Sequence, residues 1–86
     1  MEKGTFYKKI KDNKNGYTFE KTEGYIDHGK RIAYAKAHGI YEKNKMFWTA
    51  TDTQTGLYVT TAHRTRKECI AEVEKNIEAI EKVRND

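Results

Sequence analysis

Proline is absent from this 86-residue chain, cysteine occurs once, and no long apolar run is found anywhere in it. The single thiol, Cys69, cannot close an internal disulfide, which is typical of proteins from a reducing compartment. No stretch approaches the roughly 20 apolar residues that a helix needs to cross a bilayer. The residues from Met1 to Lys9 also lack the apolar segment of a secretion signal. We therefore expect a cytoplasmic protein without membrane contacts.

Motifs that carry chemistry are missing as well. The histidines, at positions 28, 38 and 63, show no metal-ligand spacing, and the isolated glycines form no phosphate-binding loop. Cys69 lies near the start of an expected helix, where a thiol can become reactive, but no motif places a base beside it. A small apolar residue in the core is the interpretation we favour. We expect a binding protein with no enzymatic activity, metal or cofactor.

The composition is polar but compatible with a folded chain. Hydrophobic residues make up 36% and charged residues 35%, while an aromatic content of 12% argues against disorder. A chain of this length has room for one modest core, so we expect a single domain over residues 1–86.

Turn-forming residues divide the chain ahead of residue 64 into five stretches. Asn, Asp, Gly and Lys gather at positions 13–16, 27–30, 42–45 and 52–56, and Asn and Gly tolerate the backbone of tight turns. Aromatic and apolar residues lie between these positions. The pattern predicts an antiparallel meander of about five strands within residues 5–63.

The segment 31–39 fits two interpretations. Ala33, Ala35 and Ala37 favour a helix, and Gly39 could end one. As a strand, the segment would place the three alanines on one face and leave room for a closely packed element above them. We prefer the strand.

A helix over about 65–84 is the clearest prediction. Thr65 and Glu68 have the spacing of a capping box, and the apolar residues that follow recur at helical intervals. They are Ile70, Val73, Ile77 and Ile80. If the last hairpin pairs Ala50 with Val59, Trp48 and Val59 share the face that this stripe covers. The expected fold class is α+β, an antiparallel meander with one C-terminal helix packed on one face.

Charge is distributed unevenly along the sequence. Residues 1–48 carry 11 Lys and Arg against 6 Asp and Glu, a balance of +5, whereas residues 49–86 carry 6 against 7, a balance of −1. We expect the positive residues on the sheet face that the helix leaves open, where they would attract polyanions. Tyrosine and phenylalanine in the strands could stack on bases there, or serve in ordinary packing.

Part of the sequence resembles two protein families. This part comprises the segment from Trp48 to Gly56, the expected strand Leu57-Tyr-Val-Thr-Thr61, and the helix start Thr65-Arg-Lys-Glu68-Cys69. One is the arm-type DNA-binding domain of phage and transposon tyrosine recombinases, which lays a sheet in the major groove. The other is the HicB-like antitoxin fold, in which a Gly-x-x-Val-Thr strand precedes the helix and the module neutralises an RNA-cleaving toxin.

These resemblances imply different partners. The first implies DNA contact, and we expect the binding residues to be Arg31, Lys36, Lys43, Lys45, Tyr58 and Arg64. The second implies a protein partner. Our first hypothesis is therefore DNA or RNA binding through the basic sheet, and the alternative is a protein-binding inhibitor or antitoxin-like accessory factor of a phage or mobile element, such as an inhibitor of a host nuclease defence.

Overall fold

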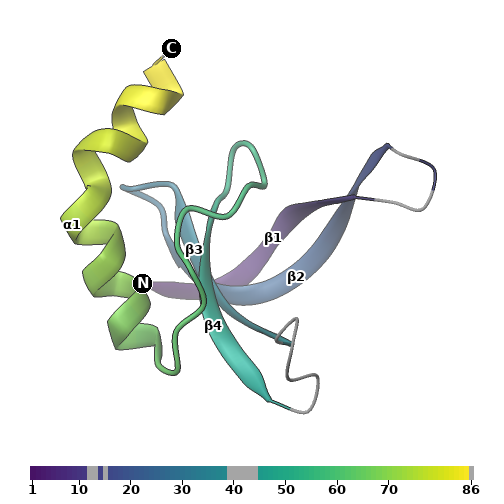
Figure 1. Cartoon of the computed structure of the whole chain (residues 1–86), viewed down its shortest axis with the longest axis horizontal. Coiled ribbons are helices and arrows are strands. Elements are labelled where there is room, and N and C mark those ends of the chain that lie inside the picture. Colours follow the sequence, from purple (N-terminus) through teal and green to yellow (C-terminus); the bar gives the residue numbers. More distant parts are fainter. Residues whose placement is uncertain (12–13, 15, 39–44, 86) are drawn as a thin grey trace.

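A computed structural model describes residues 1–11, 14, 16–38 and 45–85, and it shows a curled antiparallel sheet with one helix (Figure 1). The elements, in chain order, are β1 (Glu2–Lys11), β2 (Tyr17–Asp27), β3 (Ile32–His38), β4 (Met46–Asp52) and α1 (Arg66–Asn85). Each strand pairs with the next along the chain. The predicted α+β class, the antiparallel order and the C-terminal helix are confirmed.

The described residues form four strands rather than about five, because the segment after β4 pairs only at isolated points. Trp48 bridges to His63 and Thr51 to Tyr58, so a longer span of this segment faces a shorter span of β4. The segment has two more residues between the bridge positions than β4 has, and the Thr60 hydroxyl accepts a hydrogen bond from the Ala50 N–H at 3.0 Å. Residues 57–63 therefore lie along β4 without forming a regular strand.

The segment that fits two interpretations is a strand in the structure. β3 pairs with β4 over its whole length, and Tyr34, on the helix side, is fully buried. Ala33 and Ala35 lie on the other side in a second apolar cluster with Phe6 and Ile26. Small side chains are needed there because the sheet packs closely. A Cβ added at Gly24 would lie 2.4 Å from the Tyr34 carbonyl oxygen.

α1 begins after a capped turn and covers the outer side of β3 and β4. The Thr65 hydroxyl accepts a hydrogen bond from the Glu68 N–H at 3.1 Å, which is the first of the two hydrogen bonds of the predicted capping box. The same hydroxyl donates to the Glu68 carboxylate at 3.0 Å. Cys69 and Val73 then enter a buried cluster with residues of β3 and β4. Burial raises the pKa of the Cys69 thiol, so the core interpretation of this residue is supported.

Polar contacts fix α1 at two further positions. Near its C-terminal end, Arg84 Nε donates to Asp52 Oδ2 at 2.7 Å, and both side chains are almost fully buried. Near its N-terminal end, Glu72 accepts hydrogen bonds from the Thr61 N–H at 3.2 Å and the Thr61 hydroxyl at 2.8 Å. His63 Nε2 lies 2.6 Å from the same carboxylate. The helix is thus tied both to β4 and to the segment that follows it.

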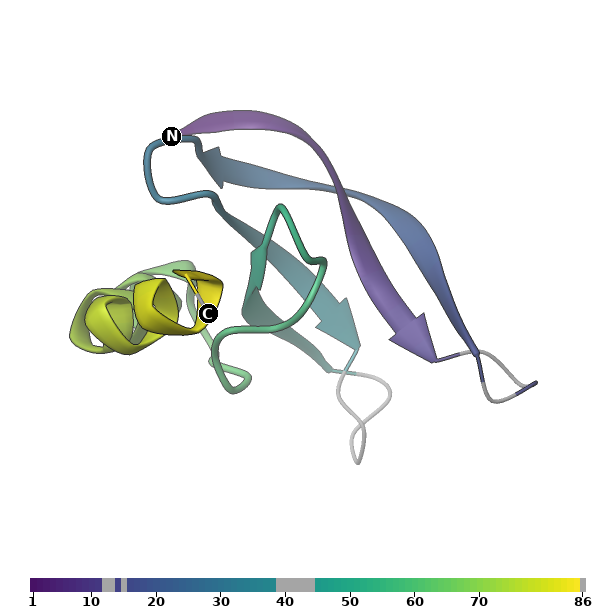
Figure 2. The ribbon, with the colours of Figure 1, turned by 90° about the horizontal axis from the view of Figure 1, so that it is seen from above.

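The sheet curls until β1 meets the turn after β4. The Lys9 N–H donates to the Gly56 carbonyl at 2.8 Å, and Gly56 has a φ of 79° that favours glycine. Figure 2 shows α1 on one side of β3 and β4 and the β1–β2 hairpin on the other. In the described part of the chain, no helix is long and apolar enough to span a membrane.

This curl changes one expectation from the sequence. The sequence predicts an open and basic sheet face opposite α1, but Ala33, Ala35, Thr49 and Thr51 are buried at the centre of that face. Lys8 is also buried at the edge of this inner face, with its ammonium 5.8 Å from the Tyr58 ring centroid. The expectation is wrong for this part of the sheet, because β1 and β2 bend over it and convert it into an interior.

Candidate nucleic-acid interface

The expected binding residues are spread over three parts of the molecule. Lys36 lies on β3, Lys45 immediately before β4, and Arg64 before α1, and all three are exposed. The strand register brings them to the same end of the sheet, because Lys36 pairs with Trp48 and Trp48 bridges to His63. Lys43 lies outside the described residues.

Arg31 and Tyr58 lie elsewhere. Arg31 sits in the turn before β3, about 17 Å along that strand from Lys36 at 3.3 Å per residue. Its guanidinium donates to the side-chain oxygen of Gln54, and its φ of 57° marks a tight turn. Tyr58 covers the buried Lys8 on the inner side. The six expected residues therefore do not form one surface.

A cluster of cations and rings surrounds Trp48 near the start of α1. The Arg66 guanidinium carbon lies 4.0 Å from the Tyr25 ring centroid and 5.8 Å from that of Trp48. The Lys36 ammonium lies 5.6 Å from the Trp48 ring, and the two rings are 6.2 Å apart. These rings are half-buried. The cluster holds the helix start against the sheet more than it offers surfaces for stacking.

A different arrangement occupies the outer face of the β1–β2 hairpin. Three successive cross-strand pairs each place an aromatic ring opposite a lysine. They are Tyr7 with Lys21, Phe19 with Lys9, and Tyr17 with Lys11. Residues alternate between the two faces of a strand, so these six side chains share one face. We call these six residues the hairpin face; they are three lysines and three aromatic residues, and the next pair on the same side, Thr5 with Glu23, contributes the first carboxylate.

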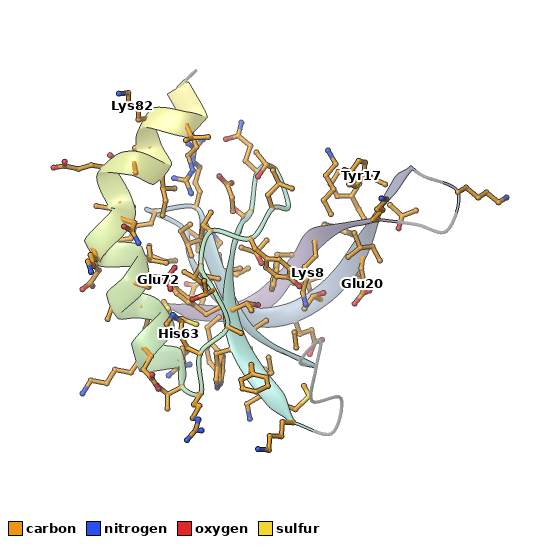
Figure 3. The ribbon with its side chains drawn as sticks, viewed as in Figure 1. Lys8, Tyr17, Glu20, His63, Glu72 and Lys82 are labelled. Carbon is orange, nitrogen blue, oxygen red and sulfur yellow. The ribbon has the colours of Figure 1, made fainter. Side chains whose placement is uncertain are left out.

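The rings of the hairpin face are accessible. Tyr7 is 53% exposed, Tyr17 62% and Phe19 61%, values that are unusual for large aromatic side chains in a small fold. Figure 3 shows Tyr17 on one side of the hairpin and Glu20 on the opposite side, as the alternation requires. The Lys9 ammonium lies 4.7 Å from the Tyr17 ring centroid. Aromatic and cationic groups are therefore interleaved over the same surface.

A hollow adjoins the hairpin face where the sheet closes. It has a volume of about 350 Å³ and is lined by Tyr7 and Phe19 on one side and by Thr53, Gln54 and Gly56 on the other. The turn that supplies the second wall is rigidly held. Asp52 accepts the Gln54 N–H at 2.8 Å, and the Arg31 carbonyl accepts the Thr53 N–H at 3.0 Å. This wall brings an amide and a hydroxyl close to two exposed rings.

The sequence contains part of this signal. Tyr7, Tyr17 and Phe19 belong to the strand aromatics that could stack on bases, whereas the cations expected from the sequence lie on other strands. The turn at 13–16 already indicates the hairpin, and its register would place Lys9, Lys11 and Lys21 beside those rings. The hollow could not be foreseen, because it depends on the curl that brings Gly56 to Lys9.

Comparison with protein-family models, with curated proteins and with solved structures finds no match to this chain. Among the described residues, no group of three or more His, Cys, Asp or Glu side chains could hold a metal ion.

Proposed function

We propose that the protein binds nucleic acid through the hairpin face. The observation that carries this proposal is the series of three aromatic–lysine pairs, each on the same side of the hairpin and each with an exposed ring. Lysine neutralises phosphate and releases counterions, and an exposed ring offers a surface for a base. The alternation sets both kinds of contact along one direction.

The distribution of charge over the elements agrees with this assignment. The exposed carboxylates of α1, including Glu74, Glu78 and Glu81, lie on the helix, which stands on the far side of β3 and β4 from the hairpin (Figure 1). α1 as a whole carries five Lys and Arg against five Glu, so its charges balance, whereas the hairpin face carries three lysines, and a polyanion is therefore attracted to the hairpin face more than to the helix.

Salt dependence tests the proposal. We expect binding of a fluorescent oligonucleotide, followed by anisotropy, to weaken steeply as salt rises. The substitutions Lys9→Ala, Lys11→Ala and Lys21→Ala should each make the slope of log affinity against log salt shallower. The expected change is about 0.7 to 0.9 for every phosphate that the variant no longer neutralises.

Lys82→Ala is the matched control, because Lys82 is an exposed lysine on α1 (Figure 3). It should leave the slope unchanged. Binding that does not depend on salt, or an equal effect of Lys82→Ala, would contradict the proposal.

A second candidate function is recognition of a protein partner, and one groove favours it. The C-terminal half of α1 and the segment after β4 enclose a volume of about 470 Å³, which includes Leu57, Val59, Ile80 and Val83 in its lining. Leu57 and Val83 are exposed apolar side chains. In this case Leu57→Ser and Val83→Ser would abolish a stable protein complex and leave oligonucleotide binding unchanged.

A further inference from the structure

We infer that the hairpin face binds single-stranded nucleic acid in preference to duplex, with one base held in the hollow between the rings of Tyr7 and Phe19 and the turn at Gln54. This inference rests on the proposed function and specifies its ligand. The ligand is recognised by its unstacked bases, which single-stranded RNA and single-stranded DNA share.

The exposed rings distinguish a single strand from a duplex. Bases of a duplex are stacked on one another, so an aromatic side chain on a protein surface reaches only their edges. Bases of a single strand can turn outward and stack on such rings. Phe19 has no polar group with which to contact phosphate or a groove edge, yet it is 61% exposed in the middle pair of the hairpin face.

The spacing of the rings suits successive bases. Tyr17 and Phe19 are two residues apart on β2, which separates their Cα atoms by about 6.6 Å at 3.3 Å per residue. Lys9 and Lys11 lie opposite them on β1. A single strand of nucleic acid that runs along β2 would therefore place its bases on the aromatic rings and its phosphates beside the lysines.

The hollow adds a polar wall to the stacking surface. Its volume of about 350 Å³ is at the small end of ligand pockets, which fits one base. Gln54 accepts a hydrogen bond from Arg31 through its side-chain oxygen, so its NH₂ group is the part that remains to contact a ligand. An NH₂ donor would select bases that present an acceptor on the edge facing the turn.

The test compares short single strands of DNA and RNA with duplexes of the same sequence, using Phe19→Ala, Tyr7→Ala and Gln54→Ala. We expect the unmodified protein to bind single strands more tightly than the duplex. Phe19→Ala and Tyr7→Ala should each weaken single-strand binding by about 5- to 150-fold, the range for removing one stacked base. Gln54→Ala should keep overall affinity and reduce the differences in affinity between the four homopolymers.

Tyr58→Ala is the matched control, since Tyr58 is a tyrosine as exposed as Tyr7, at 52% against 53%, but lies beside Lys8 on the inner side of the sheet and not on the hairpin face. It should bind single strands normally. Three results would overturn the inference and leave phosphate binding intact. The unmodified protein could bind a single strand and a duplex with equal affinity, or Phe19→Ala could weaken binding of both equally. Tyr58→Ala could also weaken single-strand binding as much as Phe19→Ala does. Absence of binding to any nucleic acid would instead refute the proposed function. Comparison of the affinities for single-stranded DNA and single-stranded RNA shows which of the two the protein prefers.

Discussion

Thr51 is a polar residue at one of the most deeply buried positions of the sheet. It is 1% exposed, and within the described part of the chain its hydroxyl has no hydrogen-bond partner. A buried hydroxyl without a partner costs about 1–3 kcal/mol in desolvation. Valine has nearly the same shape and no such group. The residue therefore lowers the stability of the fold without a compensating contact.

We predict that Thr51→Val raises the free energy of unfolding by about 1 kcal/mol. Urea unfolding followed by circular dichroism measures the change. Thr53→Val, at a half-buried position in the following turn, is the control and should not stabilise the protein. A decrease in stability in Thr51→Val would mean that the hydroxyl makes a stabilising hydrogen bond in solution.

At the scale of elements, the buried ion pair between α1 and β4 is the main polar link between the two layers. Burial acts to raise the pKa of Asp52, but hydrogen bonds from Arg84 and from the N–H groups of Gln54 and Thr55 outweigh it. The pKa of the carboxyl therefore lies below its usual value. The same carboxylate thus joins the helix to the strand and organises the turn that walls the hollow.

Removing one partner of this pair should be costly. We predict that Arg84→Met destabilises the fold by about 3–5 kcal/mol, because Asp52 would remain as a buried charge without its cation. Lys82→Met, on an exposed position of the same helix turn, should change stability by less than about 0.5 kcal/mol. Urea unfolding at neutral pH gives both values, and equal effects would contradict the prediction.

The pair also predicts how stability depends on acid. Because the pKa of Asp52 is lower in the folded than in the unfolded chain, its contribution is complete above the unfolded value of about 3.9 and is lost as pH falls through the folded value. We expect the difference in stability between the unmodified protein and Asp52→Asn to be constant from pH 7 to about 5 and to shrink below about 4. Unfolding in urea over this range measures it, and a difference that grows in acid would contradict the assignment.

At the scale of the whole molecule, the contact between Lys9 and Gly56 closes the curled sheet. A Cβ at position 56 would lie 2.8 Å from the Lys9 nitrogen, and the φ of 79° disfavours any other residue. We predict that Gly56→Ala destabilises the fold by about 1–3 kcal/mol. It should also raise hydrogen exchange at the Lys9 amide. Gly29→Ala, at an exposed turn, is the control; similar exchange at Lys9 in both variants would show that the closure is not formed in solution.

The local features of this fold could be predicted from sequence, and the curvature could not. The Thr65 cap, the apolar stripe of α1 and the turns at 27–30 and 52–56 depend on neighbouring residues, and the structure contains them; the turns expected at 13–16 and 42–45 lie mostly outside the described residues. The curl depends on the contact of Gly56 with Lys9 and on the close packing over Gly24, which sequence patterns do not encode. For this reason the sheet face that we expected to be open and basic is an interior in the structure. The candidate interface is the hairpin face instead.

The same closure bears on the order in which the chain acquires its interior during synthesis. β1 and β2 leave the ribosome first and can pair as a hairpin, but Gly56, which closes the sheet onto β1, is made much later. Until β3 has been made, Phe6 and Ile26 have no covering alanines, and the nascent hairpin exposes both its faces. We expect ribosome-bound chains halted before residue 56 to be protease-sensitive along β1, and chains extended by a C-terminal linker that brings α1 out of the exit tunnel to be protected there.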